Sequence, residues 1–175
     1  MTPPTFIPAN LAMHRDALLR INIEYMLWVA GEMEKAFALS TVDLIRLPVP
    51  EYVASMIDKV CGDVPPRGAF YLIERQGEIA GMGGLRWVRK GVAEIKRIYV
   101  RPAHRGAGLG EAILHRVLDD AAAFGYRSVV LDSAPFMRSA QRLYESAGFV
   151  DRAPYAETEV PAALHNAWRF MERSL

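Results

Sequence analysis

The sequence has a single cysteine, Cys61, among its 175 residues, and it has no long apolar run. One cysteine excludes an internal disulfide, and no paired spacing of cysteine and histidine points to a zinc site. No segment approaches the length of a membrane span, and the N-terminal segment lacks the basic start of an export signal. The sequence therefore favours a cytoplasmic protein that is not exported and binds no metal.

An excess of one charge is also missing, since 21 basic and 20 acidic residues give a net charge of +1. This balance provides no electrostatic reason to expect nucleic acid or a membrane surface as a partner. The hydrophobic share of 51% allows a sizeable core, and the chain is short for two domains. We find no repeats or low-complexity tracts, and we expect one domain over residues 1–175.

The segment 105–110, Arg-Gly-Ala-Gly-Leu-Gly, lies between an expected strand over 94–100 and an expected helix over 111–124. Glycines allow backbone conformations that a Cβ forbids, and the first turn of a helix offers unpaired N–H groups at the positive end of its dipole. A strand, a glycine loop and a helix in this order are typical of phosphate binding. The first hypothesis is therefore a cofactor that carries phosphate.

Two well-known phosphate loops fit this segment poorly. A P-loop needs Lys and then Ser or Thr after its last glycine, whereas Glu111 and Ala112 follow here. A dinucleotide-binding loop has a different glycine spacing, and it follows a continuously apolar strand rather than the polar strand 94–100. A turn that only caps a helix explains one glycine but not three at alternate positions beside several basic residues.

The segment resembles the acetyl-coenzyme A loop of the GCN5-related N-acetyltransferase (GNAT) family, whose pattern is Arg/Gln-x-x-Gly-x-Gly/Ala. Arg105, Gly108 and Gly110 fill its three fixed positions. The run 98–102, Ile-Tyr-Val-Arg-Pro, and the run 143–149, Leu-Tyr-Glu-Ser-Ala-Gly-Phe, resemble the fourth strand and the final helix of that family. These marks follow the family's order and spacing, and together they are more specific than one glycine loop.

The resemblance implies a GNAT-like acyl-CoA N-acyltransferase fold, an α/β (α+β) fold whose central mixed sheet is mostly antiparallel and flanked by helices. The hydrophobic pattern predicts a strand over 5–9, a helix capped by Asn10 that reaches Trp28, and a loop over 31–49 that contains a second helix. Further along the chain it predicts a helix over 51–60, strands over 69–73, 79–85 and 92–100, a helix over 111–124, a strand over 128–131, a helix over 139–147, and strands near Val150 and over 168–171.

The same resemblance implies acetyl-CoA as the acyl donor. If the fourth strand splays from the fifth, as in the family, its free N–H groups bind the pantetheine amides and polarise the thioester carbonyl. The pyrophosphate is then expected on the loop amides, with added charge from an arginine. The expected cofactor-binding residues are Ile98, Tyr99, Val100, Arg105, Gly106, Ala107, Gly108, Leu109, Gly110 and Ser139. Met137 stands where the family often carries a cofactor-contacting Asn, which leaves the contacts of 136–139 open.

Acetyl transfer needs an acid, because the departing thiolate must be neutralised. Tyr144 stands at the family's position for this general acid, and its hydroxyl group stays protonated at neutral pH. The alternative role of Tyr144 is to pack its helix onto the sheet, since Ala140 and Ala147 share its helix face.

Acetyl transfer also needs a base, because an amine is mostly protonated near neutral pH. Glu94 is the expected base, since it lies on the cofactor strand and its spacing from the glycine loop resembles the histone acetyltransferase branch of the family. Strand periodicity places Glu94, Lys96, Ile98 and Val100 on one face. The alternatives are an ion-paired glutamate at a strand end, a water chain, or a base elsewhere.

The sequence therefore predicts an N-acetyltransferase that moves the acetyl group of acetyl-CoA to a primary amine by direct attack, with a small molecule as the favoured acceptor. A protein amine is an alternative acceptor, and a non-catalytic acyl-CoA-binding module or a nucleotide-binding dehydrogenase is an alternative function. We expect the first helices and the loops near Trp87 and Pro154–Tyr155 to select the acceptor, with Trp28 and Trp87 as candidate pocket residues. The resemblance also allows a homodimer.

Overall fold

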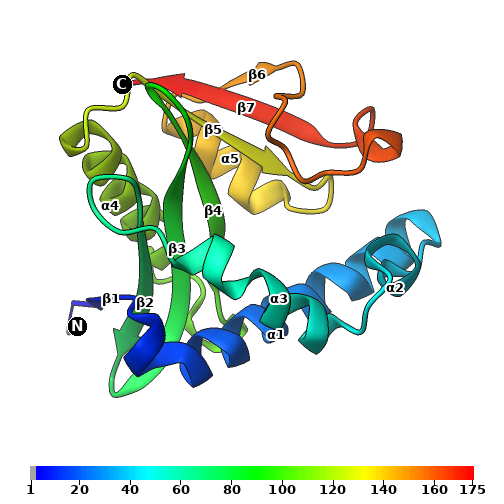
Figure 1. Cartoon of the computed structure of the whole chain (residues 1–175), viewed down its shortest axis with the longest axis horizontal. Helices are drawn as coiled ribbons and strands as arrows, with labels where there is room; N and C mark the ends of the chain where they lie inside the picture. Colours follow the sequence, from blue (N-terminus) through cyan, green and yellow to red (C-terminus); the bar gives the residue numbers. More distant parts are fainter. Residues whose placement is uncertain (1–2) are drawn as a thin grey trace.

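Seven strands form one mixed sheet in the computed structural model, which describes residues 3–175 (Figure 1). They lie in the order β1-β2-β3-β4-β5-β7-β6, and every neighbouring pair is antiparallel except β4 and β5. The strands are β1 Thr5–Pro8, β2 Ala69–Arg75, β3 Glu78–Arg89, β4 Val92–Val100, β5 Ser128–Ser133, β6 Val150–Arg152 and β7 Arg169–Ser174. The mostly antiparallel mixed sheet is confirmed. The single domain expected over 1–175 stays a prediction, and its residues 1 and 2 lie outside the described part.

Helices cover both faces of this sheet. α1 (Leu11–Phe37) and α3 (Val49–Cys61) pack on one face, in blue and cyan in Figure 1, and α4 (Leu109–Ala123) and α5 (Arg138–Ser146) pack on the other. The short α2 (Thr41–Ile45) follows α1, and two 3-10 turns occupy Pro102–His104 and Ala162–Leu164. No described helix combines the length and the apolar character that a membrane crossing requires.

α1 is longer than the sequence predicts. It begins where expected, because the Asn10 side chain accepts hydrogen bonds from the N–H groups of Ala12 and Met13. The helix does not stop at Gly31, since nothing there forces a turn, and the burial of Met33 offsets the cost of about 1 kcal/mol that a glycine adds inside a helix. It ends at Phe37, and the next residue, Ala38, caps it with a left-handed φ of 54°. The loop predicted from residue 31 therefore begins later.

A β-bulge at Arg97 breaks the two-residue period of β4. Met82 pairs with Tyr99 and Gly84 pairs with Lys96, so β4 has one residue more than β3 between these two pairs. Arg97 accommodates the extra residue with a φ of 53°. Such a bulge redirects every side chain that follows it.

The bulge overturns the predicted faces of β4. Ile95 and Ile98 both pack against the core beneath α4 and α5, although an unbroken strand would place them on opposite faces. Glu94 alternates with Ile95 and so lies on the α1 face with Lys96, whereas Val100 packs with Ile98 on the α4 face. The prediction that Glu94, Lys96, Ile98 and Val100 share one face is therefore wrong.

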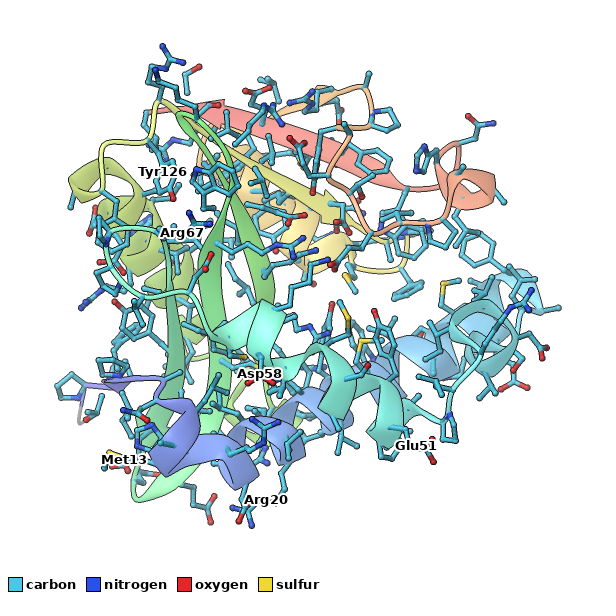
Figure 2. The ribbon with its side chains drawn as sticks, in the orientation of Figure 1. Met13, Arg20, Glu51, Asp58, Arg67 and Tyr126 are labelled. Carbon is cyan, nitrogen blue, oxygen red and sulfur yellow. The ribbon has the colours of Figure 1, made fainter. Side chains whose placement is uncertain are left out.

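The packing of α4 against the sheet predicts that Leu114→Ala lowers the free energy of unfolding by about 2 to 5 kcal/mol, because the fully buried side chain leaves a cavity when it is removed. Met13→Ala is the control, since Met13 is 76% exposed at the outer surface of α1 (Figure 2). We expect it to cost less than about 0.5 kcal/mol. Urea denaturation measures both values, and equal losses would contradict this packing.

Candidate active site

β4 and β5 separate shortly after they begin to pair. Their parallel pairing joins 92–94 to 128–130 and extends no further. In the described part of the chain, residues 95–100 pair with no strand on the β5 side of β4. A cavity of about 500 Å³ opens there. Backbone N–H and C=O groups at such a place need hydrogen-bond partners, so a ligand between the strands can bind them.

The glycine loop forms one end of this cavity. Gly106 and Gly108 have φ angles of 76° and 73°, in the left-handed region that glycine adopts without strain. Gly108 is also the N-cap residue of α4, so the first N–H groups of that helix lie at the cavity with no partner inside the helix. A Cβ at either glycine would meet nothing within 4 Å, and the loop therefore faces open space. An anion can approach this backbone closely.

Arg105 attaches the loop to the end of β4. Its Nε donates a hydrogen bond of 3.0 Å to the carbonyl of Val100, and its guanidinium lies 6.0 Å from the ring centre of Tyr99. The Tyr99 hydroxyl donates to Glu24 over 3.0 Å, and burial together with this bond raises the pKa of Tyr99 to about 12. Among the described residues, the two Nη groups of Arg105 have no partner, so they can meet a phosphate.

The cavity collects the predicted cofactor-binding residues with one exception. Ala107 does not line it, whereas Met137 and Arg138 do, from the start of α5. The contacts that the sequence left open at 136–139 therefore lie at the cavity. The predicted residues that line it are Ile98, Tyr99, Val100, Arg105, Gly106, Gly108, Leu109, Gly110 and Ser139.

Tyr144 reaches the same cavity from α5. Its side chain is only 7% exposed, and its ring packs 5.8 Å from that of Phe149. Burial raises the pKa of the Tyr144 hydroxyl well above its usual value, so the group stays protonated. No residue in the described part forms a hydrogen bond with this hydroxyl. A buried donor without a partner costs free energy, and a ligand in the cavity can accept its hydrogen bond.

Glu94 lies outside the cavity, with its side chain fully buried on the other face of β4. One carboxylate oxygen lies 2.6 Å from Nη2 of Arg86 and accepts a bond of 2.7 Å from its Nε. The other accepts a bond of 2.6 Å from the hydroxyl of Tyr155 and lies 3.1 Å from Nζ of Lys96. The structure does not bring Glu94 to Tyr144, and its role as the base stays a prediction.

Asp132, which the sequence analysis missed, is the carboxylate that does line the cavity. It lies on β5 just beyond the last residue pair with β4. Its Oδ1 accepts a bond of 3.1 Å from the indole of Trp168, and its Oδ2 lies 3.3 Å from the Tyr155 hydroxyl and 3.8 Å from Nζ of Lys96. Its one signal in the sequence is an acidic residue directly after the apolar run 129–131.

A second cavity of about 190 Å³ adjoins the first and shares with it Tyr25, Ile95, Arg97 and Asp132. Aromatic side chains stand beside both cavities. The ring of Tyr25 lies 6.1 Å from that of Trp28, Trp28 lies 5.9 Å from Phe136, and Phe136 lies 6.3 Å from Trp168. Trp28 thus lines the larger cavity, and the prediction that the first helices select the acceptor stays a prediction.

Trp87 lines neither of these two cavities, and its prediction as a residue of the acceptor pocket stays a prediction. The side chain is 40% exposed on β3, where the guanidinium of Arg67 lies 4.7 Å from its ring. Arg67 lies beside Tyr126, and the Tyr126 hydroxyl donates to its carbonyl (Figure 2). Trp87 therefore stacks with Arg67 at the protein surface.

The described residues show no group of three or more His, Cys, Asp and Glu side chains that could hold a metal ion. Cys61, the single cysteine, is buried, and burial raises the pKa of its thiol to about 12. It is therefore a neutral thiol near pH 7, and its Sγ lies 4.0 Å from the side-chain nitrogen of Asn22.

Comparison with known proteins agrees with this geometry. The sequence profile of the acetyltransferase (GNAT) family matches residues 37–149. The chain belongs to the GNAT family. A GNAT protein of this kind is an enzyme, an N-acetyltransferase, which agrees with a cavity that joins a glycine loop to a buried tyrosine.

Relatives of this GNAT enzyme match it over part of its length. It is 28% identical to the IAA acetyltransferase of Azospirillum brasilense over 127 residues, which are 62% of this chain and 83% of that protein. It is 37% identical to an uncharacterized N-acetyltransferase of Schizosaccharomyces pombe over 75 residues, 43% of this chain and 46% of that one, so it spans about half of that relative. The PaiA N-acetyltransferase of Thermoplasma acidophilum, solved with coenzyme A, shares the fold, with a TM-score of 0.69 and 11% identity over 99% of this chain and 100% of that one.

The glycine loop predicts different effects for two neighbouring substitutions. Gly108→Ala should lower the free energy of unfolding by about 1 to 2 kcal/mol, because a residue with a Cβ is strained in the left-handed conformation at a φ of 73°. Gly110→Ala is the matched control, since Gly110 is helical and a Cβ there would lie 3.7 Å from Leu143. This change should be neutral or stabilise by up to about 1 kcal/mol. Denaturation curves of both variants test the difference, and equal losses would show that crowding, not the backbone angle, is limiting.

Proposed function

We propose that this enzyme transfers the acetyl group of acetyl-CoA to a primary amine of a small molecule by direct attack on the thioester. The observation that carries the proposal is the buried Tyr144 hydroxyl, which has no partner in the described protein and lies in the same cavity as the unpaired backbone of β4. A donor for a leaving thiolate and donors for a carbonyl oxygen are what thioester aminolysis requires.

The residues at the cavity suit coenzyme A in their chemistry. The loop at Gly106 and Gly108 presents backbone N–H groups and open space to a pyrophosphate, and Arg105 adds a positive charge. The open side of residues 95–100 can bond the amides of a pantetheine arm. The complex of PaiA N-acetyltransferase with coenzyme A, which has the same fold, further supports this assignment.

The reaction divides into attack and departure. The amine nitrogen attacks the thioester carbon, and backbone N–H groups of β4 stabilise the negative charge that develops on the carbonyl oxygen. When the C–S bond breaks, the hydroxyl of Tyr144 gives its proton to the leaving sulfur. The products are the N-acetylated amine and coenzyme A with a free thiol.

In this proposal Asp132 takes the proton that the ammonium group loses before it attacks. The second proton, which nitrogen loses after the attack, replaces the one that Tyr144 gives to sulfur. Asp132 lines the cavity, whereas Glu94 does not. Glu94 is the base predicted from the sequence, and the Tyr155 hydroxyl connects its carboxylate to that of Asp132. Glu94 then acts as a positioning residue that holds Lys96 and Tyr155 beside Asp132.

A small acceptor is supported by the size of the second cavity, about 190 Å³, and by the aromatic rings that border it. A cytoplasmic location is consistent with the single free thiol of Cys61. The homodimer that the family resemblance allows stays a prediction.

The function is tested by a thermal-shift titration with acetyl-CoA, coenzyme A, NAD and ATP, followed by thiol release from acetyl-CoA with a panel of amines. Acetyl-CoA should raise the melting temperature, because a ligand of the native state stabilises it. Turnover with an amine separates an enzyme from a module that only binds acyl-CoA. Stabilisation by NAD without any response to CoA species would contradict the proposal.

Tyr144→Phe should lower kcat by about 10²-fold or more, because it removes the proton donor and keeps the ring. The affinity for acetyl-CoA should change little. In the wild type, the raised pKa of Tyr144 predicts that kcat does not fall between neutral pH and about pH 10, the usual pKa of tyrosine. Tyr126→Phe is the control, since this hydroxyl bonds the Arg67 carbonyl away from the cavity (Figure 2). An unchanged kcat in Tyr144→Phe would refute the acid role.

Asp132→Asn and Glu94→Gln separate the two candidate bases. Asp132→Asn should lower kcat/KM by about 10²-fold, because the proton acceptor is lost. Glu94→Gln should mainly lower the melting temperature, because it leaves buried cations with one carboxylate fewer. Stopped assays on the folded fraction measure kcat/KM, and thermal denaturation measures the melting temperature. If Glu94→Gln lowers the kcat/KM of the folded fraction by this factor and Asp132→Asn does not, Glu94 is the base.

A further inference from the structure

We infer that the acceptor is a small amine that also carries a carboxylate, with Arg97 binding the carboxylate and Asp132 facing the amino group. The inference rests on the proposed function and adds the substrate class. Both residues line both cavities, so one small molecule can contact them together and still reach the thioester.

The charges beside the second cavity leave Arg97 without a counter-ion. The other charged side chains of this region pair with one another at 2.6 to 3.8 Å, and they balance as three cations and three anions. They are Lys59, Arg86, Lys96, Glu94, Asp132 and Glu159. Burial lowers the pKa of Lys96, but its carboxylate neighbours outweigh this effect and raise it, so Lys96 keeps its charge. In the described chain, no carboxylate lies within 4.0 Å of Arg97, which is half-buried.

The guanidinium of Arg97 is oriented by one hydrogen bond. Its Nη1 donates to Oδ1 of Asn22, a fully buried residue. The Nδ2 of Asn22 in turn donates a bond of 2.8 Å to the carbonyl of Leu18. Nε and Nη2 of Arg97 have no partner in the described protein. These two groups form the edge of a guanidinium that binds a planar carboxylate through two parallel hydrogen bonds. A fixed arginine with this edge free is suited to such a ligand.

Asp132 completes a site for a zwitterion. A protonated amine is attracted to its carboxylate, and the same carboxylate is the proposed acceptor of the amine proton. Tyr25 and Trp168 border the second cavity and offer apolar surface to a side chain. The acceptor class that fits is therefore a free amino acid with an apolar or aromatic side chain.

The test compares acceptors that differ only in the carboxylate: L-phenylalanine, L-phenylalaninamide and 2-phenylethylamine, and L-methionine with L-methioninamide. The wild-type kcat/KM should be about tenfold or more higher for each amino acid than for its counterpart without a carboxylate, mainly because KM is lower. Arg97→Gln should reduce this ratio to about one. Arg97→Lys should give an intermediate ratio, because it keeps the charge and loses the bidentate edge.

Arg20→Gln is the matched control. Arg20 lies on α1, as Asn22 does, but it is exposed on the outer surface of the helix (Figure 2), so its loss should leave the ratio unchanged. Equal wild-type kcat/KM for acids and amides would overturn the inference and leave the acetyltransferase function intact. A ratio that survives in Arg97→Gln, together with weaker acetyl-CoA binding, would also overturn it. If the arginine variants do not fold, the wild-type ratio still decides, and the absence of any acetyl-CoA response would instead refute the proposed function.

Discussion

The early end of pairing between β4 and β5 is the constraint on which the site depends. Parallel strands normally satisfy each other's backbone groups along their length, but these two stop at Glu94. The remainder of β4 keeps its partner β3 on one side and offers its other side to a ligand. The bulge at Arg97 then turns the side chains of Ile98 and Val100 onto the α4 face. A sheet that paired fully would have no cavity between the glycine loop and Tyr144.

A buried charged cluster connects the two strands where their hydrogen bonds end. Lys96 of β4 lies near Asp132 of β5, and the Tyr155 hydroxyl bonds Glu94 of β4 and approaches the same Asp132. Burial of such charges gains little stability, because desolvation offsets their attraction. Its effect here is geometric, since it holds a carboxylate at the cavity while the strands stay apart.

The sequence was most reliable for features whose cause is local. Asn10 caps α1 as expected because a cap depends on adjacent residues, and the glycines adopt left-handed angles that only glycine accepts without strain. It was wrong where packing decided. Gly31 stays helical because the rest of α1 packs on α3.

By itself, the sequence determined the GNAT family, the mixed sheet with its flanking helices and the glycine loop before α4, because these follow from motifs and from hydrophobic periodicity over short stretches. Only the tertiary structure decided which carboxylate lies at the cavity and which arginine is left without a counter-ion. Glu94 meets Tyr155 across 61 residues of chain, and Arg97 meets Asn22 across 75. Local periodicity cannot specify such contacts, since they form only when the separated strands, α1 and the segment after β6 pack together.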